Sequence, residues 1–201
     1  MIAYLPVSFV VYIEQRNENP MKLLFLTNNK SQSLILSLFL LVSYNIVLAS
    51  DSFDSSYRLA RSPLIKANEI VRLTNHSSID VREALAQNRK LKRAALFKLA
   101  SDVSKRVRIA VATNLSTDTK TFMVLAIDAN QSVRSVVARF EYVPAEVLAV
   151  LAKDKSAEIR LEVARNLNTQ ATTLKSLLTD SDPDVQSIAA HSLQRLENEA
   201  K

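Results

Sequence analysis

The chain has 201 residues, a net charge of +6 and no glycine, cysteine or tryptophan. Without glycine it lacks the dinucleotide fingerprint, the P-loop, the nucleophile elbow and the EF-hand loop, and without cysteine it lacks disulfides, thiolate nucleophiles and cysteine-ligated metals. Glycine also supplies the positive φ angles of tight hairpins, so its absence favours a helical protein over a sheet protein.

The first segment with a clear pattern is a leader. Residues 34–49 carry no charge, Lys22 and Lys30 precede them, and a polar stretch begins at Ser50. A basic start, an apolar middle and a small-residue end are the parts of a signal peptide, so we expect cleavage after Ala49. The alternative is an uncleaved membrane anchor, although a spanning helix needs ~20 apolar residues.

The leader also suggests where translation starts. Residues 1–20 fit a signal peptide poorly, whereas Met21 opens the ordinary leader sequence MKLLFLTNNK. We therefore interpret Met21 as the start, residues 1–49 as the leader and residues 50–201 as the mature domain. This domain is expected to be periplasmic or secreted, with membrane contact only through an uncleaved leader.

The remainder repeats with a period of 26 residues. Apolar, arginine, alanine, leucine and aspartate positions recur at this spacing without an insertion. The columns are Val81, Val107, Val133, Ile159 and Val185; Arg82, Arg108, Arg134 and Arg160, then Gln186; Ala86, Ala112, Ala138, Ala164 and Ala190; Leu96, Phe122, Leu148 and Leu174; Leu99, Leu125, Leu151 and Leu177; and Asp102, Asp128, Asp154 and Asp180.

Each unit has the pattern of two helices joined by a turn. Val107, Ala110 and Val111 form one helical stripe, Phe122 and Leu125 belong to a second, and turn-forming residues 114–117 separate them. Such a unit cannot bury its stripes alone, so neighbouring units must stack. We predict an all-α protein, a right-handed α-solenoid of about five to six 26-residue helix-turn-helix repeats, with residues 55–80 as a degenerate first unit.

Polar residues mark the predicted helix starts. Three positions before each leading Val or Ile stand residues that are favoured as N-caps. They are Ser78, Ser104, Asn130, Ser156 and Asp182. Pro183 is expected at the first position of the last helix and Pro144 at the first position of a second helix.

The segment VRIAVATNLSTDTKTFMVLAID, residues 107–128, resembles the leucine-rich repeat variant and HEAT-like repeats. The resemblance covers about residues 55–195 and implies an Asp–Arg ladder, with Asp102–Arg108, Asp128–Arg134 and Asp154–Arg160 as pairs and Asp180 facing Gln186. It implies a protein-binding scaffold, although some HEAT-like proteins are DNA glycosylases or chromophore lyases. Because the ladder recurs in every unit, we interpret it as structural rather than catalytic.

Neither histidine suggests chemistry. His191 occupies a solvent-facing column of the first helices, and His76 replaces the ladder aspartate at one end of the array. They are too far apart in the sequence to indicate a metal site. We expect no cofactor, no metal and no catalytic residue.

A basic cluster and an apolar face are the candidate binding features. Residues 81–106 carry the charge excess, concentrated at a turn and at a helix start where the macrodipole disfavours cations. Apolar residues beside the core stripe of the second helices are either an exposed groove or a wider core. The candidate partner-binding residues are Arg89, Lys90, Lys92, Arg93, Phe97, Lys98, Met123 and Val124; Ile127 and Val150 extend the apolar set.

The sequence favours an exported, non-enzymatic scaffold that binds a protein or peptide. One alternative is that the basic repeat binds an anionic envelope polymer or lipid. The other is a HEAT-like repeat enzyme of the lyase or glycosylase type, which export and the lack of tryptophan disfavour. Nucleic acid is not the expected partner because the domain is expected outside the cytoplasm.

Overall fold

The computed structural model describes residues 42–43 and 52–199, and residues from Ser55 onward form one compact unit. Residues 52–61 are helical. The helices that follow are α2 (Ala67–Thr74), α3 (Ile79–Ala86), α4 (Arg93–Leu99), α5 (Lys105–Ala112), α6 (Thr119–Ala126), α7 (Gln131–Arg139), α8 (Ala145–Leu151), α9 (Ala157–Arg165), α10 (Ala171–Leu177) and α11 (Pro183–Glu199). Across the described part of the chain there is no strand.

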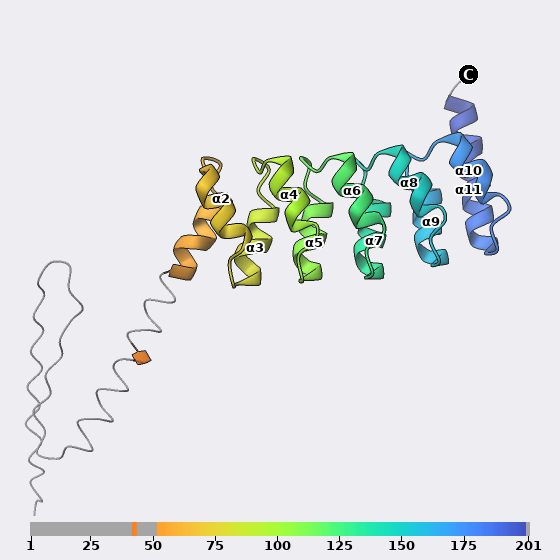
Figure 1. Cartoon of the computed structure of the whole chain (residues 1–201). Helices are drawn as coiled ribbons and strands as arrows, with labels where there is room; N and C mark the ends of the chain where they lie inside the picture. The colour runs from red at the N-terminus through yellow and green to blue at the C-terminus, as the bar shows by residue number, and fades with distance from the viewer. Residues whose placement is uncertain (1–41, 44–51, 200–201) are drawn as a thin grey trace, which may run out of the picture. The chain divides into compact units, whose positions relative to one another are not determined.

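The helices form two rows along the array, as Figure 1 shows. The first helices of the units, α3, α5, α7, α9 and α11, pack against one another in succession. The second helices α2, α4, α6 and α8 do the same in the other row, while α10 packs against α9 and α11. This arrangement confirms the predicted α-solenoid of helical repeats.

The repeated apolar columns form the core. The leading column from Val81 to Val185 is fully buried, and so are the two leucine columns of the second helices, in which Phe122 replaces one leucine. In the degenerate first unit Ala60, Ile70 and Leu73 are buried at the equivalent positions. The core therefore runs continuously from unit to unit rather than closing within any one of them.

The helix starts lie close to where the sequence predicts them, but their caps differ. Asn130 caps α7 through a bond from the Ser132 N–H at 3.0 Å, whereas Ser78, Ser104 and Ser156 stand at the N-cap without a side-chain cap bond. Pro183 is the first residue of α11, as predicted.

Pro144 was expected at the first helical position, and this was wrong by one residue. It is the N-cap of α8, with ψ of 146°. An extended residue here still meets the requirements of proline, because the N-cap lies outside the helical hydrogen-bond ladder.

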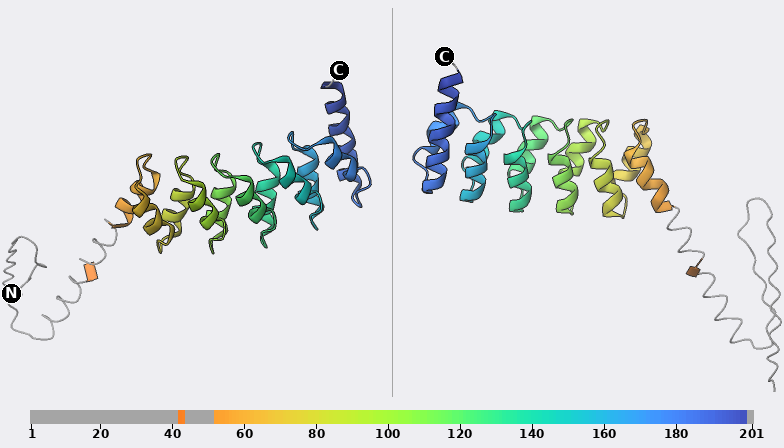
Figure 2. Two further views of the ribbon diagram at one scale, coloured as in Figure 1. Left: turned by 45° about the horizontal axis from the view of Figure 1, so that its top comes forward. Right: turned by 180° about the vertical axis from the view of Figure 1, so that it is seen from behind.

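The C-terminal helix α11 is longer than the others and extends past the two rows (Figure 2). The predicted leader, its cleavage point after Ala49 and the proposed start at Met21 lie outside the described residues, apart from Val42 and Ser43, which are helical. Among the residues that the structure describes, no helix has both the length and the apolarity to cross a bilayer.

Candidate functional site

The basic cluster lies on the surface around the start of α4. Arg89 and Lys90 are in the turn after α3, Lys92 is the N-cap of α4 and Arg93 is its first residue. All four side chains are exposed. Within the described residues none of them donates a side-chain hydrogen bond or forms an ion pair at contact distance, although the charge of Arg93 helps to lower the pKa of Asp118 at the start of α6.

Phe97 and Lys98 extend this surface along α4. Lys98 differs from the cluster because its Nζ donates to Asn75 Oδ1 at 2.9 Å. Phe97 is 38% exposed, and Lys120 Nζ of the neighbouring helix α6 lies 4.6 Å from the centroid of its ring. An ammonium at this distance is attracted to the π face, so α4 and α6 share one surface.

Met123 and Val124 do not form the freely exposed groove that was one of the two expectations. Both side chains are half-buried and pack against the core. The core stripe of α6 is therefore wider than its spacing indicated. Ile127, the residue after α6, and Val150 on α8 remain exposed. We call Phe97, Met123, Val124, Ile127 and Val150 the second-helix face.

One end of the second-helix face is hollowed. A depression of about 400 Å³ lies where α6 and α8 end, lined among others by Ile127, Val150, Lys153 and Lys155. Phe97, Met123 and Val124 do not line it. The structure thus brings Ile127 and Val150 together in the depression, while exposed Phe97 and half-buried Met123 and Val124 lie outside it.

The arginine column forms a ladder with the aspartate column. In each pair Arg Nε donates to Asp Oδ2 at 2.6–2.7 Å and Arg Nη2 donates to Oδ1 at 2.7–3.1 Å. The carboxylate also accepts a backbone N–H two residues on, which fixes the turn before the next first helix. The pairs are Arg82–Asp102, Arg108–Asp128, Arg134–Asp154 and Arg160–Asp180.

This pairing corrects the ladder expected from the resemblance. The expected partner of Arg108 was Asp102, six residues earlier, but its side chain pairs with Asp128, twenty residues later. Arg108 does contact Asp102, through a bond from Nη1 to the backbone carbonyl at 2.7 Å. Gln186 likewise donates to the Asp180 carbonyl at 2.5 Å, while the Asp180 carboxylate is held by Arg160. Each arginine therefore ties two successive inter-unit turns together.

The ladder lowers the pKa of three of its carboxyl groups, those of Asp102, Asp154 and Asp180. Burial alone would raise the pKa of Asp154, but hydrogen bonds from the Arg134 guanidinium and the Ser156 N–H hold it below its ordinary value. The hydrogen bond from Arg160 is the largest cause of the lowered pKa of Asp180. A carboxylate stabilised in its charged form is a poor general acid near neutral pH. The geometry thus supports a structural role for the ladder.

A second ladder, formed by asparagines, was not foreseen. Asn114 Nδ2 donates to the carbonyls of Ala86 at 2.6 Å and Asn88 at 3.1 Å, at the C-terminal end of the preceding first helix. Asn88 and Asn166 make equivalent bonds, and Ser192 Oγ donates to the Ala164 carbonyl at 2.7 Å. The recurrence of asparagine at Asn88, Asn114 and Asn166, in register with the 26-residue period, could have revealed this ladder. From the sequence alone, this part of the repeat was interpreted only as a turn.

The asparagine ladder is interrupted at Phe140. Its ring centroid lies 6.0 Å from that of Phe122 and 5.7 Å from that of Tyr142, so a partly exposed aromatic group replaces the amide. A depression of about 430 Å³, lined by Phe140, Tyr142, Asn114, Arg89 and other residues of three units, lies at this point. At this junction an aromatic contact therefore replaces the asparagine contact that joins the neighbouring units.

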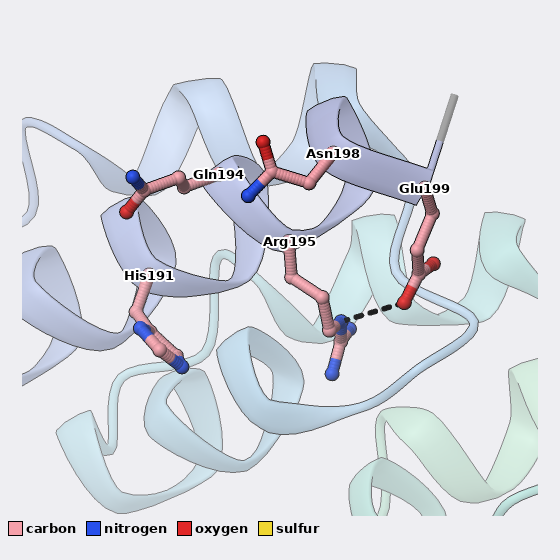
Figure 3. A pocket seen from close by; sticks show the side chains of 5 residues that line it. All are labelled: His191, Gln194, Arg195, Asn198 and Glu199. Carbon is pink, nitrogen blue, oxygen red and sulfur yellow. Dashed lines mark ion pairs between the residues drawn. The ribbon is translucent and has the colours of Figure 1, made fainter. Parts of the chain in front are cut away.

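Neither histidine is part of a reactive arrangement. His76 Nδ1 accepts the Ser78 N–H at 3.1 Å, so its ring takes the place of a ladder carboxylate. His191 lines a shallow depression of about 380 Å³ on α11, with Gln194, Arg195, Asn198 and Glu199 (Figure 3). Among the residues described, no group of three histidine, cysteine or acidic side chains could hold a metal ion.

Comparison with solved structures identifies the architecture. The chain matches a leucine-rich repeat variant, described as having a novel repetitive structural motif, with a TM-score of 0.52 and 21% identity over 65% of this chain and 52% of the other. The chain has the fold of a helical repeat protein. This confirms the resemblance inferred from residues 107–128, and the chain spans about half the length of that solved protein.

Two artificial proteins also match. An engineered protein aligns with a TM-score of 0.35 and 17% identity over 72% of this chain and 90% of its own, and a designed armadillo repeat protein with 0.34 and 16% over 71% and 90%. No family model matches the chain, and neither does any curated protein. Helical repeat proteins commonly offer extended surfaces for protein binding.

Proposed function

We propose that this repeat protein is a non-enzymatic scaffold that binds a protein or peptide through the second-helix face. The observation that supports it is the combination of exposed Phe97, Ile127 and Val150 with cations that have no internal partner, on an array whose buried polar side chains are satisfied. Exposed apolar surface rimmed by polar and charged residues is typical of protein-binding sites.

The test is selection of binding peptides from a displayed random library on the full chain. Selected peptides are then measured against Phe97→Ala, a change that copies Ala149 at the equivalent position of α8. Ile79→Ala is the matched control, because Ile79 is 40% exposed but lies on α3 in the other row. Binding should weaken several-fold in the first variant and stay unchanged in the second. Equal loss in both would place the site elsewhere.

We also propose export, based on the uncharged stretch 34–49 with basic residues before it and a polar switch after it. The mature protein should then begin at Ser50. N-terminal sequencing of protein expressed from the whole reading frame tests this. Recovery of residues 34–49 intact in the membrane fraction would instead indicate an anchor.

Binding of an anionic envelope polymer or lipid is the second candidate function. Arg89, Lys90, Lys92 and Arg93 favour it because all four are exposed and none forms a side-chain hydrogen bond or a contact ion pair within the described residues. Binding of this kind should weaken steeply between low and high salt, whereas binding that depends on apolar contacts should change little. Sedimentation with phosphatidylglycerol vesicles across a salt series separates the two.

A further inference from the structure

The depression at the ends of α6 and α8 combines an apolar floor with a charged rim. Ala126, Ile127 and Val150 supply apolar surface, and Ile127 is 74% exposed. Its volume of about 400 Å³ is enough for a few side chains of a partner. An apolar side chain of a partner could therefore be buried in this depression without a rearrangement of the repeat protein.

The charges of the rim are not balanced. Both acids of the lining belong to the ladder, since Asp128 is held by Arg108 and Asp154 by Arg134. Lys153 and Lys155 are exposed and form no ion pair with any described residue. The charges still available for a ligand in this depression are thus both positive.

Stacking of the repeats does not require these lysines. The positions equivalent to Lys153 hold Ser101, Ile127 and Thr179, and those equivalent to Lys155 hold Val103, Ala129 and Ser181. A cation near the C-terminal end of a second helix suits the helix dipole, and α2, α4 and α10 carry one inside the last turn, whereas α8 has none there and its lysines follow the helix end. The two lysines are specific to this junction.

The same combination recurs one unit earlier. Lys120 lies over the ring of Phe97, which again places an ammonium beside exposed apolar surface. By contrast, Arg106 on the first-helix row is paired with Asp80 and Glu83 of the preceding unit. Exposed lysines therefore accompany exposed apolar surface at two successive junctions of the second-helix face.

We propose that this lysine-rimmed depression is the anchor site for an acidic segment of a partner protein, in which an apolar side chain covers Ile127 and Val150 and a neighbouring carboxylate meets Lys153 and Lys155. The proposal rests on the scaffold function proposed above and specifies the chemistry of the partner. Apolar burial provides the affinity, and the charge pairing selects the acidic segment and speeds association.

The experiment uses the displayed-peptide selection on the full chain, followed by four variants. Lys153→Thr with Lys155→Ser and, separately, Ile127→Ser copy residues from equivalent positions of other units, so they are compatible with the fold. Leu167→Ser is the apolar control, since Leu167 is 70% exposed but lies in a turn. Lys105→Ser on α5 is the charge control. Thermal melts establish that each variant is folded.

We expect selected peptides to carry acids next to an apolar residue. The lysine double variant and Ile127→Ser should each weaken binding about tenfold at low salt, and the lysine variant should also flatten the salt dependence. The two controls should change binding less than about twofold. Peptides that bind the second-helix face but lack acids, or ignore these variants, would overturn this proposal and leave the scaffold function intact. Failure to select any peptide would contradict the scaffold function itself.

Discussion

Arg134 and Asp154 join α7 to the turn after α8 through two hydrogen bonds, Nε to Oδ2 at 2.6 Å and Nη2 to Oδ1 at 3.1 Å. The same arginine donates from Nη1 to the Asp128 carbonyl at 2.7 Å. Arg134 thus binds the turns on both sides of its own unit. Since the side chains are only 6% and 7% exposed, the pair is held away from the screening that weakens surface ion pairs.

Removing Arg134 should be strongly destabilising. Arg134→Ala leaves the Asp154 carboxylate buried without its main counter-charge, which typically costs about 3–5 kcal/mol of the free energy of unfolding. Arg106→Ala is the control, because Arg106 is 56% exposed and solvent screens its pairs with Asp80 and Glu83, which should contribute little. Denaturant titrations of the two variants measure the difference. Similar losses in both would show that the ladder behaves like a surface network.

The period of 26 residues was enough to predict the fold, but it did not predict which arginine pairs with which aspartate in the ladder. Val107 and Leu125 are fixed to the core by periodicity alone, since no other face of an amphipathic helix can bury them. Arg108, by contrast, has an aspartate six residues before it and another twenty residues after it. Both are in register with the repeat, and only the path of the turns decides which carboxylate reaches the guanidinium.

The candidate site shows the same limit. Exposure of Phe97 followed from its position beside the core stripe, but Met123 and Val124 occupy neighbouring positions and are half-buried. Contacts of α6 with its neighbours α4 and α8 decide how wide its buried stripe is, and the sequence of a single helix does not contain those contacts.

His76 gives the array a pH-sensitive end. Burial, with smaller effects from Arg72 and Arg82, lowers the pKa of its imidazole below the ordinary value of about 6.5. The folded protein therefore prefers neutral His76. The free energy of unfolding should be highest above the ordinary pKa of histidine and should decrease as the pH falls through the lower pKa of the folded state.

His76→Asp should remove this dependence and raise stability by about 0.5 kcal/mol. A carboxylate at this position can accept the Ser78 N–H, as the ladder aspartates do at equivalent turns, and it places a negative charge near Arg72 and Arg82. Denaturant midpoints between pH 5 and pH 7.5 are the measurement. His191→Asn on the exposed face of α11 is the control and should follow the wild-type curve. If the denaturant midpoint of the His76→Asp protein depends on pH as strongly as that of the wild type, His76 is not the cause of the pH dependence.

The asparagine ladder should also contribute to stability. Asn114→Ala leaves the Ala86 carbonyl without its donor in a buried place, at a typical cost of about 1–3 kcal/mol, while the Asn88 carbonyl keeps the Leu91 N–H at 3.0 Å. Thr113→Ala is the control, because Thr113 is the exposed neighbour and its hydroxyl bonds only within α5. Equilibrium unfolding of both variants checks the prediction, and a loss confined to Thr113→Ala would contradict it.

Lys92 is the N-cap residue of α4, and the equivalent N-cap position of the next unit holds an aspartate. Asp118 at the equivalent position caps α6 by accepting the Thr121 N–H at 3.0 Å, whereas Lys92 makes no side-chain cap bond. Lys92→Asp should therefore add a cap and a favourable dipole interaction to α4 and raise stability by about 1 kcal/mol. Lys90→Asp makes the same charge change two residues earlier, outside the cap position, and should bring no such gain.

Binding should respond to these two variants differently from stability. If the basic cluster attracts an anionic partner, Lys92→Asp and Lys90→Asp should both slow association and reduce sedimentation with phosphatidylglycerol vesicles at low salt, because each reverses one exposed charge in the same field. Stability and binding would then move in opposite directions for Lys92→Asp, which a purely structural role for the cluster does not predict. Undiminished vesicle binding by both variants would leave the cluster as a solvated surface and favour the second-helix face as the binding site.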